Sequence, residues 1–119
     1  MKFFILLIEG YKENLDLLRE ILERQLGHLV ETAANAHQAQ IQLRTAPFDI
    51  IMANETTAGV PGLLCKLKGG DQVLKTVLIT DDPWATKPLC LDALLRYPPP
   101  EGTTMEQAVE QVIELISWR

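Results

Sequence analysis

The sequence predicts an α/β fold in which a parallel sheet is covered by helices on both faces. Apolar runs of strand length recur along the chain, and segments with leucine, isoleucine or valine at helical spacing separate them. Such alternation is typical of parallel sheets, because each parallel connection needs a crossover. With 119 residues, 47% of them apolar, the chain is expected to form one domain, residues 1–119, around a single core.

The first half of the chain contains two predicted strand–helix pairs. Residues 3–8 form a continuous apolar run, which indicates a strand buried on both faces. Residues 13–26 carry apolar side chains at helical spacing, and Gly27 is a typical helix stop. The pattern then predicts a short strand over 29–33 and a helix over 35–44.

The second half continues the alternation. A third strand is predicted over residues 49–53, and a short helix over 63–68 ends at two glycines. Residues 73–80 form the fourth apolar run. The last helix is expected to begin with Thr103 as the N-cap, and Glu106 three residues later would complete a capping box.

The segment between the fourth strand and the last helix has the weakest pattern. Continued alternation requires a crossover over residues 83–92 and an edge strand over 94–97, which three prolines then end. Pro88 cannot lie deep inside a helix. We therefore expect a truncated or irregular fourth helix that starts near this proline.

The charge and the N-terminal sequence exclude several classes of partner. A formal net charge of −5 argues against nucleic acid, whose phosphates bind clustered Lys and Arg. No segment approaches the ~20 apolar residues of a membrane helix, so no membrane partner is expected. The first apolar run, residues 3–8, is too short for a secretory signal and is followed by the charged residues Glu9, Lys12 and Glu13. We therefore expect a cytoplasmic protein in a reducing compartment.

The cysteines and histidines do not have metal-ligand spacing. Cys65 and Cys90 are isolated, and we expect both to be buried free thiols. His28 and His37 are expected on the surface, with no metal site. No glycine-rich phosphate loop is present, so the sequence predicts no cofactor.

Three segments carry a resemblance to a known family. They are Leu-Leu-Ile-Glu-Gly at 6–10, the amphipathic segment 14–22 and Phe-Asp-Ile-Ile-Met-Ala-Asn at 48–54. Together with Gly59 and Gly62, they resemble a response-regulator receiver (CheY-like) domain over essentially the whole chain. The resemblance implies a flavodoxin-like sheet of five parallel strands in the order 2-1-3-4-5, with two helices on one face and three on the other. It also implies a role in two-component signalling or a phosphorelay.

The same resemblance implies a degenerate phosphorylation pocket. In that family, two adjacent acids after the first strand and one after the third hold magnesium, and the last acid accepts a phosphoryl group. These positions are Glu9, Gly10 and Asn54 here, while the family's threonine is kept as Thr80. An amide is not a useful nucleophile, so phosphoryl transfer to this position is not expected.

Tyr97 is predicted to occupy the position of the family's lysine. Lys87 precedes a proline, as that lysine does, but only six residues separate it from Thr80. A parallel crossover needs about a dozen residues, so Tyr97, which also precedes a proline, is the better counterpart. The family's aromatic switch position then falls near Leu94 or Leu95.

Each of these residues also has a purely structural interpretation. Glu9 is interpreted as a partly solvated loop carboxylate, and Thr80 as a structural residue. The Asn54 amide is expected to bond loop backbone and hold the pocket shut. Asp81 and Asp82 precede a proline, which is typical of a turn, and a metal site shared with Glu9 is the alternative.

The leading functional hypothesis is an atypical receiver that is not an enzyme. It would bind a protein partner of a signalling pathway without phosphorylation. Trp84, Leu95 and Tyr97 are the candidate interface, because aromatic residues often anchor interfaces, and a homodimer through this surface is a further hypothesis. Two alternatives remain open: a receiver with a residual response to a divalent cation or a phosphoryl mimic, and a small-ligand-binding domain that uses the same pocket.

Overall fold

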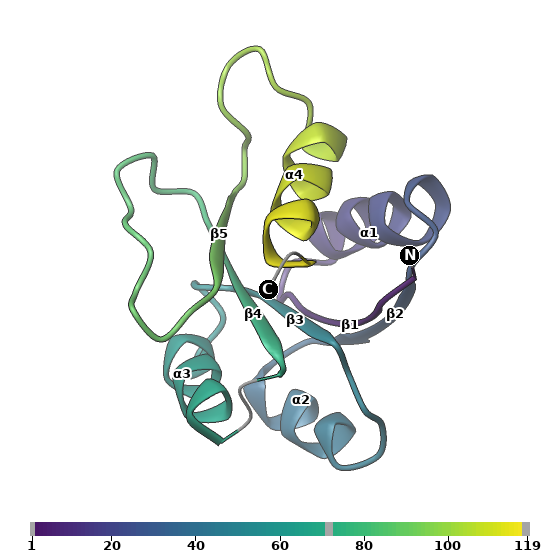
Figure 1. The fold of residues 1–119 in the computed structure, drawn as a ribbon, viewed down its shortest axis with the longest axis vertical. Helices are drawn as coiled ribbons and strands as arrows, with labels where there is room; N and C mark the ends of the chain where they lie inside the picture. Colours follow the sequence, from purple (N-terminus) through teal and green to yellow (C-terminus); the bar gives the residue numbers. More distant parts are fainter. Residues whose placement is uncertain (1, 71–72, 118–119) are drawn as a thin grey trace.

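The chain folds into a five-stranded parallel sheet with helices on both faces (Figure 1). The computed structural model describes residues 2–70 and 73–117. The strands are β1 (Phe4–Ile8), β2 (Leu29–Ala33), β3 (Ile50–Asn54), β4 (Lys75–Thr80) and β5 (Ala93–Arg96). The helices are α1 (Lys12–Glu20), continued by the π-helical turn η1 (Ile21–Gln25), then α2 (Ala36–Leu43), α3 (Val60–Gly70) and α4 (Met105–Ser117).

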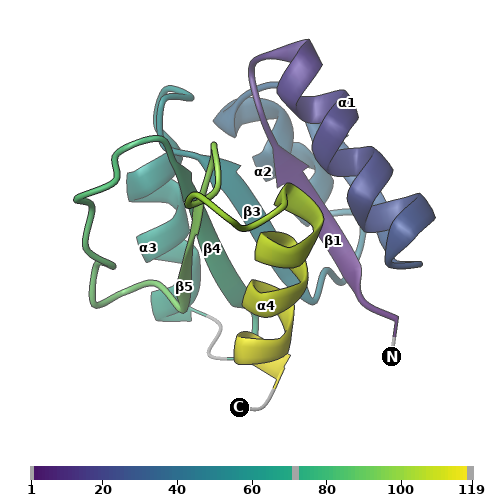
Figure 2. The ribbon, with the colours of Figure 1, turned by 90° about the horizontal axis from the view of Figure 1, so that it is seen from above.

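The strand order is β2-β1-β3-β4-β5, and every neighbouring pair is parallel, as the sequence predicts. Helices α1 and α4 cover one face of the sheet, and α2 and α3 cover the other (Figures 1 and 2). Alternate residues of β1 enter the two cores: Ile5 and Leu7 pack towards α1 and α4, and Leu6 and Ile8 towards α2 and α3. The continuous apolar run is therefore explained by a strand buried on both faces. In the described part of the chain, no helix has both the length and the apolar character needed to cross a membrane.

The crossover to β5 is irregular, as predicted, but residues 81–92 contain no helix, so the predicted truncated fourth helix is absent. Residues 81–92 contain turns and extended backbone, and the chain returns to the sheet through this irregular crossover. Asp82 closes a local turn by accepting from the Trp84 amide, and the Arg96 guanidinium donates to the carbonyls of Pro83 and Ala85. These bonds occupy backbone carbonyls that a helix would use internally, and two prolines interrupt the segment. The face of the sheet covered by α2 and α3 therefore carries these two helices and the irregular crossover.

Cys65 and Cys90 form a disulfide, so the predicted free thiols are also wrong. Cys65 lies on α3 and Cys90 lies on the crossover, with 5.2 Å between their Cα atoms. Without a fourth helix, the crossover runs against α3, which brings the two cysteines together although 25 positions separate them. Sequence spacing alone carries no signal for such a contact.

A buried ion pair holds the start of β5. Asp92 accepts hydrogen bonds from the Thr76 amide and hydroxyl and lies 3.1 Å from the Lys68 ammonium. Burial of the carboxyl group would raise its pKa, but the hydrogen bonds from Thr76 and the charge of Lys68 outweigh burial, so the pKa of Asp92 is lowered. No sequence pattern marks this aspartate as a buried ion-pair partner.

Two predicted helix boundaries and the predicted position of His28 need correction. Helix α3 begins at Val60, earlier than predicted, because a proline is tolerated in the first turn of a helix. The capping box of α4 is formed by Thr104 and Gln107, one residue later than predicted. The Gln107 backbone N–H donates to the Thr104 hydroxyl at 3.1 Å, and the Thr104 backbone N–H donates to the side-chain oxygen of Gln107 at 2.9 Å. His28 is buried and does not lie on the surface as predicted. Its ring stacks on Phe3, and its Nδ1 accepts a hydrogen bond from the Phe3 backbone N–H. His37 is exposed.

Candidate functional site: the carboxyl edge of the sheet

The residues of the predicted pocket meet at the carboxyl edge of the sheet. Glu9 follows β1, Asn54 ends β3, Thr80 ends β4 and Tyr97 follows β5. Parallel pairing brings these strand ends to one edge, where open α/β sheets usually bind ligands. We call the set Glu9, Gly10, Asn54, Thr80 and Tyr97 the degenerate pocket.

Glu9 and Asn54 are directly hydrogen-bonded. The Asn54 amide nitrogen donates to Oε1 of Glu9 at 2.8 Å, and the Tyr11 backbone N–H donates to Oε2 at 3.3 Å. Glu9 is only 2% exposed, so its predicted position as a partly solvated carboxylate is wrong. A buried carboxylate needs such donors, because an unpaired charge in the interior is costly. Asn54 therefore acts as the hydrogen-bond donor that permits burial of Glu9.

The other end of the Asn54 amide organises the loop after β3. Its Oδ1 accepts from the backbone N–H and from the hydroxyl of Thr56, both at 2.9 Å. An aspartate at this position would have no amide hydrogen for Glu9. The amide group thus connects the end of β1 to the β3–α3 loop, and both acceptor positions of its oxygen are used by Thr56.

Gly10 leaves space beside this pair. A Cβ atom built at Gly10 would meet the Ala34 carbonyl oxygen and the Thr57 hydroxyl at 3.7 Å each, which is ordinary contact distance. Thr57 is buried, and among the described residues its hydroxyl is the buried side-chain polar atom that lacks a hydrogen-bond partner. A Cβ atom can therefore be added at Gly10 without displacing backbone.

Thr80 is engaged by Glu55. The Thr80 hydroxyl donates to Oε1 of Glu55 at 2.5 Å and accepts from the Asp82 backbone N–H at 3.1 Å. Thr80 itself is buried. Glu55 was not among the predicted pocket residues, although its position directly after a strand of a parallel sheet was a usable signal. Its carboxylate fixes the threonine that the family resemblance singles out.

Tyr97 continues the sheet edge beside Thr80. The Tyr97 backbone N–H donates to the Thr80 carbonyl at 2.9 Å, and the half-buried ring packs against the core shared by α1 and α4. The Tyr97–Pro98 peptide is cis. Lys87 lies elsewhere: its ammonium donates to the Leu91 carbonyl and lines a cleft beside α3. Tyr97, and not Lys87, follows β5.

The described side chains do not fit a magnesium ion. Magnesium favours octahedral coordination by charged oxygens, usually from one or two carboxylates that are open to it. Both oxygens of Glu9 accept protein hydrogen bonds, and Asn54 presents an N–H donor to Oε1 of Glu9 where a metal site would need an oxygen ligand. Within residues 2–70 and 73–117, no group of three His, Cys, Asp or Glu side chains is arranged to hold a metal. Asp81 is exposed and Asp82 closes a turn, so neither extends the pocket.

The three predicted interface residues differ in exposure. Trp84 is 87% exposed on the crossover, and Tyr97 is half-buried. Leu95 is 1% exposed and belongs to the core, so it cannot contact a partner. It lies on the face of β5 that packs against α4, which the weak pattern of residues 81–102 did not reveal.

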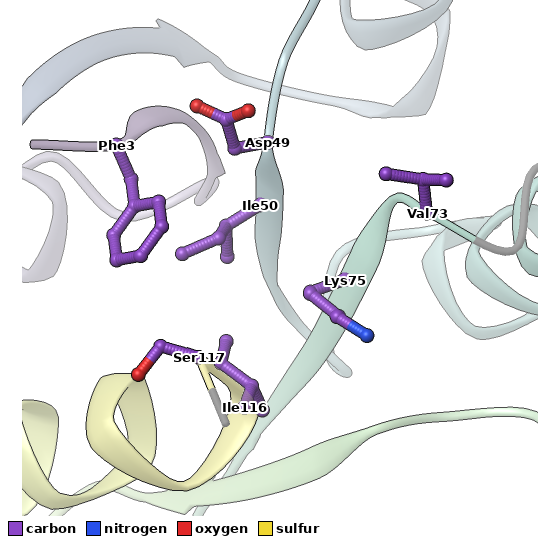
Figure 3. Close-up of a pocket in the computed structure, with 7 residues that line it drawn as sticks. All are labelled: Phe3, Asp49, Ile50, Val73, Lys75, Ile116 and Ser117. Carbon is purple, nitrogen blue, oxygen red and sulfur yellow. The ribbon is translucent and has the colours of Figure 1, made fainter. Parts of the chain in front are cut away.

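A separate pocket lies at the opposite edge of the sheet (Figure 3). It has a volume of about 160 Å³, and its lining comes from the N-terminal ends of β1, β3 and β4 and from the end of α4. Phe3, Ile50 and Ile116 form apolar walls, while the Asp49 carboxylate at its rim accepts from the Phe4 backbone N–H. This pocket shares no lining residue with the degenerate pocket.

Comparison with known proteins finds matches in structure and none in sequence. No family model matches the chain, and no curated protein matches it in sequence. Among solved structures, the chemotaxis response regulator CheY4 of Vibrio cholerae is 14% identical, with a TM-score of 0.77 over 97% of this chain and 99% of that one. A putative response regulator from Chloroflexus aurantiacus is 16% identical, with a TM-score of 0.79 over 98% and 99%.

The response regulator TrrA from Thermotoga maritima, solved with Mg²⁺–BeF, is 19% identical, with a TM-score of 0.77 over 97% of this chain and 99% of that one. TrrA is also known in complex with the histidine kinase ThkA. At these identities the likeness is one of fold. The chain therefore has the flavodoxin-like fold of CheY-like response-regulator receiver domains, over nearly its whole length.

Proposed function

We propose that this chain is a pseudo-receiver: a signalling domain that accepts no phosphoryl group and acts by binding another protein. The hydrogen bond from the Asn54 amide to Glu9 carries the proposal. The neutral Asn54 side chain stands where the family has an acid that is both the nucleophile and a metal ligand, so this chain lacks both at that position. Phosphoryl transfer to a carboxylate depends on that nucleophile and on cations that neutralise the transferring oxygens.

The remainder of the degenerate pocket supports the same proposal. Gly10 supplies no acid, and the phenol of Tyr97 supplies no positive charge where a lysine ammonium would stand. The Thr80 hydroxyl donates its hydrogen to Glu55, so this hydrogen is not directed at a phosphoryl group. These contacts favour a single, closed arrangement of the carboxyl edge.

A protein partner is the best candidate for the output. TrrA, a structural neighbour, forms a complex with a histidine kinase, and a protein partner from a signalling pathway is the corresponding proposal for this chain. Trp84 offers an exposed aromatic anchor on the crossover. The net charge of −5 favours a partner with a basic surface and disfavours nucleic acid. We further propose that the domain is not an enzyme and works in the cytoplasm.

The test is an amide NMR titration of the labelled domain with magnesium and then with beryllofluoride, a phosphoryl mimic. We expect the amides of Glu9, Asn54 and Thr80 to stay unshifted at millimolar magnesium. The matched control is the double variant Gly10→Asp/Asn54→Asp, which restores two acids and should show magnesium-dependent shifts. Coordinated shifts at Thr80 and α4 in the unmodified chain would overturn the proposal and favour a residual cation or phosphoryl-mimic response.

The buried Thr57 hydroxyl beside Gly10 favours a second candidate, a small polar ligand. The unpartnered Thr57 hydroxyl is the observation behind it, since buried hydroxyls normally have a partner. A ligand that shifts the Gly10 and Thr57 amides saturably without magnesium would support this candidate. Sedimentation at high concentration tests the proposed homodimer separately, and a monomer would remove it.

A further inference from the structure

The disulfide lies in a cleft that has the properties of a reactive thiol site. Besides Cys65 and Cys90, the cleft between α3 and the crossover is lined by Lys68, Gly69, Lys87, Leu89, Leu91 and Asp92. We call it the disulfide cleft. Its volume is about 340 Å³, and both cysteines line it and are only half-buried.

The described lining of the disulfide cleft is positively charged. Two lysines and one aspartate give a formal charge of 2 − 1 = +1, in a chain whose net charge is −5. Lys68 is paired with Asp92, so the exposed Lys87 supplies the excess positive charge of this lining. Positive surroundings and partial exposure are the conditions that favour cysteine reactivity, because the attacking and leaving species are thiolates.

We propose that Cys65–Cys90 is a site of thiol–disulfide exchange with small anionic thiols, and that its oxidation state controls how firmly the crossover is held. A thiolate attacks one sulfur of the disulfide, which forms a mixed disulfide and releases the other cysteine as a thiolate. A second thiolate attacks the mixed disulfide, and the products are the dithiol protein and the oxidised small thiol. The small thiol supplies the two electrons, and protons lost from it end on the two cysteines.

The crossover is the segment that this exchange would affect. Between residues 86 and 91, the disulfide is the covalent connection to α3, whereas the bonds of Arg96 hold the earlier part of the segment at Pro83 and Ala85. Trp84 is exposed just before this stretch, and Leu89 is exposed within it. Reduction would therefore loosen the stretch that carries Leu89, whereas the bonds of Arg96 still hold the turn that carries Trp84. This consequence is independent of the degenerate pocket.

The first test measures the rate of reduction of the oxidised chain by glutathione, which is anionic, and by uncharged mercaptoethanol. Lys87→Gln should slow reduction by glutathione about three- to fivefold relative to mercaptoethanol, as expected for loss of one charge near the reacting atoms. Lys66→Gln is the matched control, because Lys66 is next to Cys65 in sequence but lines a different pocket. Equal effects of the two variants, or equal effects on the two thiols, would overturn the role of the cleft charge.

The second test is limited chymotrypsin digestion, with cleavage after Trp84 and Leu89 followed by mass spectrometry. We expect the reduced chain to be cut after Leu89 at least about threefold faster than the oxidised chain, since cleavage follows local opening. The Cys65→Ser/Cys90→Ser variant should behave like the reduced chain under both conditions. Equal cleavage of oxidised and reduced chains would overturn control of the crossover. Two titratable thiols in denatured chain pretreated with oxidised glutathione would overturn the disulfide itself.

Discussion

The amide of Asn54 donates a 2.8 Å hydrogen bond to the buried carboxylate of Glu9, and this single contact couples the ends of β1 and β3. In a charged pocket, two carboxylates at these positions would repel each other unless a cation lay between them. The amide removes both the repulsion and the need for the cation. The pocket is therefore stable by itself, and its burial of Glu9 depends on the residue at position 54.

Asn54→Asp should destabilise the domain by about 1–3 kcal/mol, because it removes the donor and places a second negative charge beside Glu9. Asn54→Ala removes the donor without adding charge and should be less destabilising. Magnesium should raise the urea midpoint of Asn54→Asp and leave that of Asn54→Ala unchanged. If magnesium had no effect on either variant, the proposed electrostatic role of Asn54 would be contradicted.

Asp92→Ala should destabilise the domain more than a typical surface substitution does. Asp92 accepts from Thr76 and pairs with Lys68, and both members of the ion pair are largely buried. Removal of Asp92 takes away the carboxylate that faces the largely buried Lys68 ammonium, at a cost of about 3 kcal/mol. Urea unfolding measures this loss. Asp81→Ala, at an exposed position, is the matched control and should be within about 0.5 kcal/mol of the parent.

The sequence was sufficient for the sheet and insufficient for the crossover, for a physical reason. Strand β1 is apolar on both faces because helices cover both faces, so local composition reports its environment directly. Residues 81–92 instead depend on distant partners, namely Arg96 and Cys65. Pro88 signalled an interruption but not the loss of the whole helix.

The degenerate pocket shows the same division. The positions of Glu9, Asn54 and Thr80 after parallel strands were predictable from the topology of the sheet. Their bonds were not, because Glu9 could be placed in solvent as readily as against Asn54 until the distance between the strand ends was known. Glu55 illustrates this: it is adjacent to Asn54 in sequence but engages Thr80, the end of the neighbouring strand.

Thr104→Ala should destabilise the domain by about 1 kcal/mol, because its hydroxyl accepts from the Gln107 backbone N–H at the start of α4. Thr103→Ala is the matched control and should have little effect, since its described contact in this turn is a backbone bond to Pro100. Thermal unfolding of both variants measures the difference. The opposite ranking would place the cap at Thr103, as the sequence alone suggested.

His28 should make stability depend on pH below neutrality. Burial lowers the pKa of this imidazole below its ordinary value of 6.5, and its neutral Nδ1 accepts from the Phe3 backbone N–H at 3.1 Å. As pH falls below 6.5, the unfolded chain takes up a proton before the folded chain does, so the free energy of unfolding decreases until the folded pKa is passed.

The measurement compares the unmodified chain with His28→Phe by urea unfolding between pH 8 and pH 5. The variant keeps an aromatic ring against Phe3 but loses the acceptor, so it should be about 1 kcal/mol less stable at pH 8. This difference should shrink as pH falls, because only the unmodified chain pays for excluding a proton. His37→Gln, at an exposed position of α2, is the control and should follow the unmodified chain. If the difference in the free energy of unfolding between the two proteins stayed constant from pH 8 to pH 5, the buried imidazole would not be the cause of the loss of stability in acid.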